Sequence, residues 1–197
     1  MKELQLYKIR DLAIESGRSV YNIQQLANLI GRPKEITTVY FNRLVKKKMA
    51  TRLLRGRISF SDNDFIIATQ LVEPSYISLD SALLFHEITN QVPAQIHCVT
   101  PVNSIRFLEH GIVYHKIHPK LFFGYQKHMI EKSYIFVADP EKALIDGYYF
   151  NIYTLDDLLS MSENLDFTKV GKQIVNYEGR GSKKLREALA LLTKRSY

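Results

Sequence analysis

Residues 19–61 constrain this chain more than any other stretch, because segments that favour helix, turn and strand follow one another there in a fixed order. Apolar residues at helical spacing predict a helix over residues 22–30. The sequence Gly31-Arg32-Pro33 ends it, because glycine relaxes the backbone and proline lacks the N–H group that a continuing helix needs. A second helix is predicted to begin near Lys34. Two helices joined by such a tight turn are typical of a helix-turn-helix.

The second helix of the pair has an apolar side and a polar side. Its apolar stripe comprises Thr37, Phe41, Leu44, Val45 and Met49. Val39 falls outside the stripe, so we expect it to be exposed, where it could contact a thymine methyl group. Residues 51–54 and 57–60 then predict two short strands with a turn at Arg55-Gly56. Helices followed by a basic hairpin predict a winged helix-turn-helix, which places its second helix in the major groove of DNA.

Polar and basic side chains on this helix and on the hairpin are suited to contacts with DNA. We expect three of them to read base edges, namely Thr38, Asn42 and Arg43. The others are expected to hold phosphates, namely Lys34, Lys46, Lys47 and the wing residues Arg52, Arg55 and Arg57. The alternative is a purely structural winged helix whose basic face is only solvated.

The distribution of charge favours DNA as the partner. The chain has a net charge of +7, and residues 1–65 hold 13 Lys and Arg against 6 Asp and Glu. The remaining residues hold 14 of each kind, so the whole surplus lies in the first third of the chain. A phosphate backbone is the natural partner of such a segment, which makes double-stranded DNA the expected ligand. A palindromic operator would require two winged domains, so a homodimer is an open alternative.

Length and composition bound the class of protein. With 197 residues, 46% of them hydrophobic, the chain can form two small domains, which we place at residues 1–65 and 74–197. The single cysteine, Cys98, excludes an intramolecular disulfide and suits a reducing compartment. No apolar run approaches the roughly 18 residues of a membrane span. Residues 2–15 read as a helix and not as a signal peptide, so we expect a cytoplasmic protein without membrane contact.

The region after residue 74 predicts a small sheet with several helices, which makes the fold class α+β. Ser78, Asp139 and Thr154 are expected to cap helices, the first running to about Ile88 and the second to about Phe150. The other expected elements are strands at residues 95–100, 112–118 and 134–138, a hairpin connection through residues 122–131, and helices near residues 167–177 and 182–194.

Two stretches of this region carry a resemblance to a known family. They are Tyr76 to Leu83, YISLDSAL, and Pro140 to Asp146, PEKALID. With the winged domain before them, they resemble the AbiEi-type antitoxins of type IV toxin-antitoxin systems and their standalone relatives, which are described as transcriptional regulators. The resemblance implies a winged helix-turn-helix followed by an AbiEi-like C-terminal α+β domain.

The resemblance also implies a function. An antitoxin of this family represses its own two-gene operon through the winged domain, while its C-terminal domain counters a nucleotidyltransferase-like toxin. The resemblance assigns no individual residue of this chain to toxin neutralisation. Two alternatives stay open: a solitary regulator without a toxin, and a protein-interaction module that neutralises the toxin by contact and uses the winged helix as a scaffold.

The sequence predicts no enzyme, no cofactor and no metal site. All six histidines lie between His86 and His128, and none of their spacings is that of metal ligands. Asp139, Glu141 and Lys142 have the residue types of a restriction-type nuclease site without its spacing, and helix capping accounts for both acids. Residues 180–197 have a net charge of +5. They are expected either to contact DNA or an acidic partner, or to complete the core as an amphipathic helix.

Overall fold

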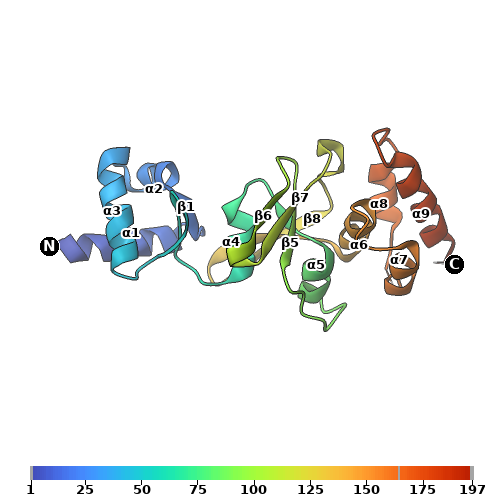
Figure 1. Ribbon diagram of the computed structural model, residues 1–197, viewed down its shortest axis with the longest axis horizontal. Coiled ribbons are helices and arrows are strands. Elements are labelled where there is room, and N and C mark those ends of the chain that lie inside the picture. The colour runs from blue at the N-terminus through green and yellow to red at the C-terminus, as the bar shows by residue number, and fades with distance from the viewer. Residues whose placement is uncertain (1, 164, 196–197) are drawn as a thin grey trace. The chain divides into compact units, whose positions relative to one another are not determined.

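The computed structural model describes residues 2–163 and 165–195, and the chain divides into two compact units (Figure 1). The first unit comprises the chain up to Glu73 together with residues 128–135. The second comprises residues 74–127 and the chain from residue 136 onward. Helices and sheets occur in a mixed order, so the fold class is α+β, as the sequence predicts.

The first unit has the element order of a winged helix-turn-helix. Its elements are α1 (Lys2–Glu15), β1 (Val20–Asn22), α2 (Ile23–Ile30), α3 (Lys34–Lys46), β2 (Thr51–Leu54), β3 (Arg57–Ser59) and α4 (Asp64–Leu71). Strand β3 lies between β1 and β2 in an antiparallel sheet. Leu26, Phe41 and Ile58 are at most 2% exposed and join α2, α3 and β3 in one core. Burial of each such side chain contributes about 1.5–3 kcal/mol to stability.

Local signals explain the two helices of the pair. Asn22 and Gln25 form a reciprocal capping box at the start of α2, with two N···O distances of 2.8 Å. Gly31 ends the helix in the left-handed conformation, with φ of 61°. Pro33 then precedes the first turn of α3. The predicted turn is confirmed, and α3 lies directly beside α2 (Figure 1).

A second segment far along the chain completes the first unit. It is the tip of the hairpin formed by β8 (Tyr125–Ile130) and β9 (Ser133–Ala138). The fully buried amide of Gln70 joins this tip to the winged fold. Its oxygen accepts hydrogen bonds from the backbone N–H groups of Ser19 and Val20, at 2.9 and 3.0 Å. Its nitrogen donates to the Ser133 hydroxyl and to the Tyr134 carbonyl, at 2.9 and 2.8 Å. The winged unit therefore extends beyond residue 65.

The second unit contains most of a six-stranded mixed sheet with the order β6-β7-β5-β4-β9-β8. Helix α5 packs against β5 and α6, and α6 also contacts α7 and α9 (Figure 1). The further elements are β4 (Tyr76–Ile77), α5 (Leu79–Phe85), β5 (Ile96–Thr100), β6 (Ile105–Phe107), β7 (Ile112–Lys116), α6 (Pro140–Tyr149), α7 (Leu155–Met161), α8 (Thr168–Ile174), α9 (Ser182–Arg195) and the 3-10 helices η1 (Leu108–His110) and η2 (Pro119–Leu121).

The predicted caps of this unit are partly corrected. Thr154 caps α7, since its hydroxyl accepts a hydrogen bond from the backbone N–H of Asp157 at 3.1 Å. Ser78 and Asp139 stand at N-cap positions but make no side-chain cap bond. Ser78 instead donates to Asp146 at 2.9 Å, and Asp139 accepts from Gln126 at 2.7 Å. Tertiary partners therefore replace the local ones at two of the three sites.

One boundary and two strands also differ from the prediction. Helix α5 ends at Phe85 and not near Ile88. The predicted hairpin connection through residues 122–131 contains a full strand, β8, which pairs with β9. Strand β6 was not predicted, because three residues carry too short an alternation to be recognised.

The two stretches that carry the family resemblance meet in a buried polar network. Lys142 and Asp146, both 1% exposed, form an ion pair within α6. The hydroxyl of Tyr76 accepts from Lys142 at 2.8 Å and donates to Asp146 at 2.9 Å, and Ser78 donates to the same carboxylate. We call these four residues the Lys142 network. Burial raises the pKa of Asp146 and lowers the pKa of Lys142, while the partners favour the charged forms.

The Lys142 network is buried and its polar groups are satisfied. All four side chains are at most 1% exposed. Among the described residues, no buried side-chain nitrogen or oxygen lacks a hydrogen-bond partner.

No helix in the described ranges is long and apolar enough to span a membrane.

Candidate nucleic-acid interface

Helix α3 presents a buried side and an exposed side to its surroundings. Thr37, Phe41 and Leu44 are buried, and Val45 and Met49 pack against the same core, so the predicted apolar stripe is confirmed. Val39 is exposed, as predicted. Thr37 turns its hydroxyl back to the carbonyl of Pro33 at 2.9 Å, which satisfies this polar group inside the core. The core thus fixes which residues α3 can offer to a partner.

The predicted contact residues lie on α3 and on the hairpin that follows it. Seven of them are exposed, namely Lys34, Asn42, Arg43, Lys46, Lys47, Arg52 and Arg55. Thr38 and Arg57 are partly buried. One compact unit carries all nine. Structure and sequence therefore agree on the elements that hold these side chains.

The wing is tied to α3 by one of its arginines. The Arg52 guanidinium donates a hydrogen bond to the side-chain oxygen of Asn42 at 2.8 Å. The same guanidinium lies 5.8 Å from the centre of the Phe41 ring, in a cation–π contact. The wing hairpin turns at Arg55-Gly56, where Gly56 has φ of 77°, a conformation that favours glycine. This hairpin is the one predicted from the sequence.

The bond between Arg52 and Asn42 changes the chemistry that each can offer. An asparagine reads adenine with its oxygen and its nitrogen together. In this structure the oxygen of Asn42 already accepts one hydrogen bond, from Arg52, which fixes the orientation of the amide. The hydroxyl of Thr38 likewise donates to the carbonyl of Lys34 at 2.8 Å, which leaves it as an acceptor. Arg43, with a planar fork of donors, is consequently the best placed of the three predicted base-reading residues.

Two other basic residues of this unit are paired with acids. Arg10 pairs with Asp11 within α1 at 2.8 Å. Arg18 donates to the Glu73 carboxylate at 3.1 Å and to the Tyr134 hydroxyl at 2.9 Å. These two arginines are therefore occupied with structural contacts. Exposed basic side chains stand on α3, on the residues that follow it and on the wing.

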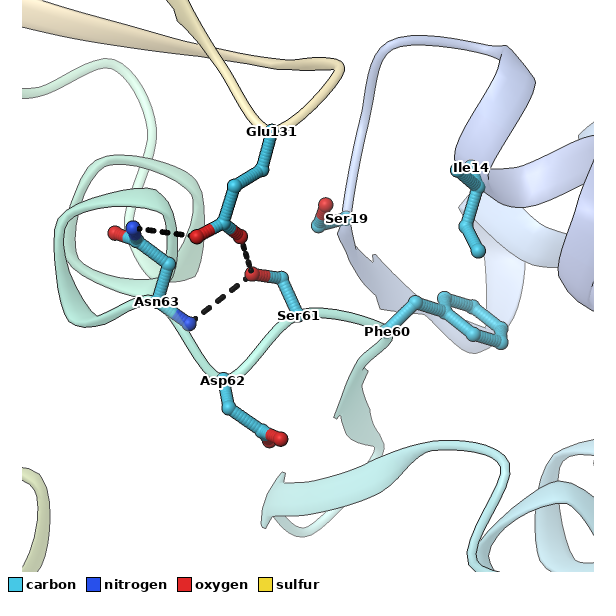
Figure 2. A pocket seen from close by; sticks show the side chains of 7 residues that line it. All are labelled: Ile14, Ser19, Phe60, Ser61, Asp62, Asn63 and Glu131. Atoms are coloured by element: carbon cyan, nitrogen blue, oxygen red, sulfur yellow. Dashed lines mark hydrogen bonds between the residues drawn. The ribbon is translucent and has the colours of Figure 1, made fainter.

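An open pocket of about 490 Å³ lies in the same unit, beside the segment that leaves the wing (Figure 2). Figure 2 shows Glu131, at the hairpin tip, reaching toward Ser61 and Asn63, which donate to its carboxylate at 3.2 and 3.1 Å. Ile14 and Phe60 form an apolar side of the pocket. Because Asp62 and Glu131 line it, a phosphate would be repelled there. The pocket is therefore not part of the candidate interface, and the hydrogen bonds to Glu131 hold the segment that follows the wing.

Two histidines in the second unit come together, although no histidine cluster was predicted. Nδ1 of His97 on β5 lies 2.9 Å from Nε2 of His115 on β7, and the rings stack. Burial lowers the pKa of both, that of His115 to about 4. No group of three potential metal-ligating side chains occurs within the described residues. The pair is therefore a hydrogen-bonded contact between two neutral rings.

The basic C-terminal segment is partly committed to the fold. Lys184 donates to the Tyr148 carbonyl and to Asn151, both at 2.6 Å, at the end of α6. Arg186 donates to the Tyr177 carbonyl at 3.3 Å. Leu185, Ala188 and Leu192 are buried, which agrees with an amphipathic helix that completes the core. The side chains of Lys194 and Arg195 lie outside the described part of the structure.

The fold, but not the sequence, is similar to that of a solved protein. No family model matches the chain, and no curated protein matches it either. The crystal structure of the RV2827C protein from Mycobacterium tuberculosis covers 94% of this chain and 80% of its own, with a TM-score of 0.51 and 10% sequence identity. At this identity the likeness concerns the fold alone.

Proposed function

We propose that the protein is a DNA-binding transcriptional regulator. Helix α3 enters the major groove, with Arg43 directed at base edges. Lys34, Lys46 and Lys47 of α3 and its C-terminus, together with the wing arginines, contact phosphates on either side of the groove. Such a role requires access to the chromosome, so we expect the protein in the cytoplasm.

One observation carries this proposal. The segment that holds the entire charge surplus of the chain is also the one with the element order of a winged helix-turn-helix. Its basic residues on α3 and the wing are exposed apart from the partly buried Arg57, whereas Arg10 and Arg18 are paired with acids. A merely solvated face would not require exposed basic side chains to gather on the two elements that contact DNA in this module.

For the second unit we propose the role that the family resemblance implies. The protein would then be the antitoxin and autorepressor of a toxin-antitoxin operon. The supporting observation is that Tyr76 and Ser78 from one resembling stretch bond to Lys142 and Asp146 from the other. These residues hold β4 to α6, so the resemblance concerns the centre of the fold and not its surface. The test is co-expression with a nucleotidyltransferase-like gene from the same operon, where rescue of growth supports the role.

The DNA-binding proposal is tested with two variants that remove one arginine each. Arg43→Ala should reduce affinity for the DNA upstream of the protein's own gene by about 10- to 100-fold and leave affinity for a scrambled duplex nearly unchanged. Arg55→Ala should weaken binding to both duplexes alike and reduce the salt dependence by about one ion. Fluorescence anisotropy with labelled duplexes measures both effects.

A matched control removes the same charge from the second unit. Lys172 on α8 is exposed, and Lys172→Ala should leave both affinities within about twofold of those of the natural protein. If Arg43→Ala, like Arg55→Ala, lost as much affinity for the scrambled duplex as for the upstream duplex, the division between base and phosphate contacts would be overturned. Absence of binding by the unaltered chain would favour the alternative, in which the winged helix is a scaffold and the protein acts through contact with a toxin.

A further inference from the structure

Two aliphatic side chains stand on the exposed side of α3. Ile36 and Val39 are each 46% exposed. They lie three residues apart, so their side chains are neighbours on the helix surface, and Arg43 follows Val39 by one turn. The sequence pattern singled out Val39 alone, whereas the structure adds Ile36 and makes a pair.

The pair has no evident role within the first unit. The partly buried apolar residues that pack against the core from α3 are Tyr40 and Val45. Exposed β-branched residues also lower helix propensity relative to alanine, lysine or glutamate. Single exposed aliphatic residues are common on protein surfaces. Two adjacent ones lie in the first half of α3, which also carries the exposed Lys34 and Glu35, and the exposed Arg43 and Lys46 follow on the next turns. Aliphatic side chains beside exposed basic ones indicate a partner with apolar groups among negative charges.

The major groove of DNA offers such a surface. Its phosphates attract the basic residues of α3, and the thymine methyl is the apolar group on its base edges. We propose that Ile36 and Val39 read thymine methyl groups, so that the half-site bound by α3 contains thymines next to the base contacted by Arg43. This inference rests on the proposed function and names the bases that the same surface prefers.

Helix geometry restricts the spacing of these bases. Residues three apart are separated by about 4.5 Å along a helix, close to the roughly 3.4 Å step between base pairs. Ile36 and Val39 therefore reach thymines in adjacent or alternate base pairs. A second copy of the chain is a poorer occupant, because a two-fold contact through this face would bring the basic residues Arg43 and Lys46 of both copies close together.

The test replaces thymine by deoxyuridine, which lacks only the methyl group. A random library of 20-base-pair duplexes is enriched for binding to the full chain, and the selected duplex is then made with dT and with dU. Affinity for the dU duplex should fall about fourfold for each methyl group contacted, the value expected for one buried carbon. Anisotropy at fixed salt gives the dT/dU ratio.

Variants assign the effect to the two side chains. Val39→Ala and Ile36→Ala should each lower the dT/dU ratio toward one, because the side chain that touches the methyl is gone. Both substitutions favour helix, so the fold is retained, as circular dichroism can check. Leu12→Ala is the matched control, because Leu12 is 42% exposed on α1 of the same unit. This substitution should leave the dT/dU affinity ratio at the value of the natural protein.

Each outcome bears on one level of the proposal. Enrichment of a duplex without thymine, or equal affinity for its dT and dU forms, overturns methyl readout and leaves DNA binding intact. A dU penalty that persists in Val39→Ala and Ile36→Ala assigns the readout to other residues and also overturns the inference. If no duplex is enriched and binding is absent at low salt, the proposed function itself fails. Self-association through Ile36 and Val39, seen by sedimentation without DNA, would likewise refute the assignment.

Discussion

Replacement of Lys142 by methionine is the most informative change in the second unit. Methionine fills the same volume but leaves the buried Asp146 carboxylate with only the hydroxyls of Tyr76 and Ser78 as donors. Loss of one partner of a buried ion pair costs about 3–5 kcal/mol, because the remaining charge is uncompensated. Since whole domains are stable by about 5–15 kcal/mol, we expect a large fall in the urea concentration at half-unfolding.

The pH dependence of this variant follows from Asp146. Burial already raises the pKa of Asp146, and removal of the Lys142 charge raises that pKa further. A carboxyl whose pKa is raised on folding stabilises the native state below its unfolded pKa near 3.9, and this contribution is lost as the pH rises through the folded pKa. The deficit of Lys142→Met against the natural protein should therefore be largest at pH 7 and shrink toward pH 4.

The double variant Lys142→Met with Asp146→Leu separates the charge from the packing. It should recover only part of the lost stability, because it removes the uncompensated charge but leaves the buried hydroxyls of Tyr76 and Ser78 without the partners they have here. Lys172→Met, at an exposed site, should change the unfolding free energy by less than about 0.5 kcal/mol. Urea unfolding followed by far-ultraviolet circular dichroism measures all three. A loss below about 1 kcal/mol in Lys142→Met, or an equal loss in the double variant, would refute the reasoning.

Three further changes probe other parts of the fold. Burial lowers the pKa of His97 and His115. The stability that the two neutral rings contribute is therefore complete above their unfolded pKa near 6.5 and is lost as the pH falls toward 4. Because the rings are partly exposed, solvent screening limits this loss of unfolding free energy to about 1–2 kcal/mol. In His115→Phe the difference in urea midpoint between pH 7 and pH 4.5 should shrink accordingly, and an unchanged difference would exclude the pair as its source. Gln70→Leu removes the acceptor of two backbone N–H groups and should cost about 2–4 kcal/mol in urea unfolding, whereas a loss under 1 kcal/mol would mean that water replaces the amide. Gly147→Ala places a Cβ 2.2 Å from the Tyr153 ring, so it should destabilise by about 1–3 kcal/mol in thermal unfolding, and a neutral result would indicate that the ring moves freely.

The first unit could be predicted in detail because its signals are local. Gly31 and Pro33 lie directly at the turn that they cause, and the apolar spacing from Phe41 to Leu44 is that of one helix face. Arg55-Gly56 marks the wing in the same way. The exposed positions of Arg43 and Lys46 follow from this register, so the elements and the surface of the candidate interface are readable without a structure.

Long-range partners could not be predicted. The sequence next to Ser78 and Asp139 predicts that both cap helices. In the fold, Ser78 instead donates to Asp146, and Asp139 accepts from Gln126. Gln70 gave no signal, because its role depends on a hairpin tip more than 60 positions away along the chain. His97 and His115 meet because β5 and β7 pair in parallel, and sequence spacing does not encode that register.

The bond between Arg52 and Asn42 shows the same limit within the candidate interface. Both residues were predicted to contact DNA, one through a phosphate and the other through a base. Their hydrogen bond at 2.8 Å reduces what each can offer independently. Spacing along α3 and along β2 indicates that each residue is exposed, but it does not indicate that they face each other.

The central claim is tested most directly by the salt dependence of binding to the DNA upstream of the protein's own gene, with a scrambled duplex beside it. Six phosphate-contacting residues per copy predict that the logarithm of the affinity falls with the logarithm of salt concentration with a slope of about −5. We expect this slope together with tighter binding to the upstream duplex. A slope shallower than −1, or equal affinity for both duplexes at every salt concentration, would contradict a sequence-specific regulator.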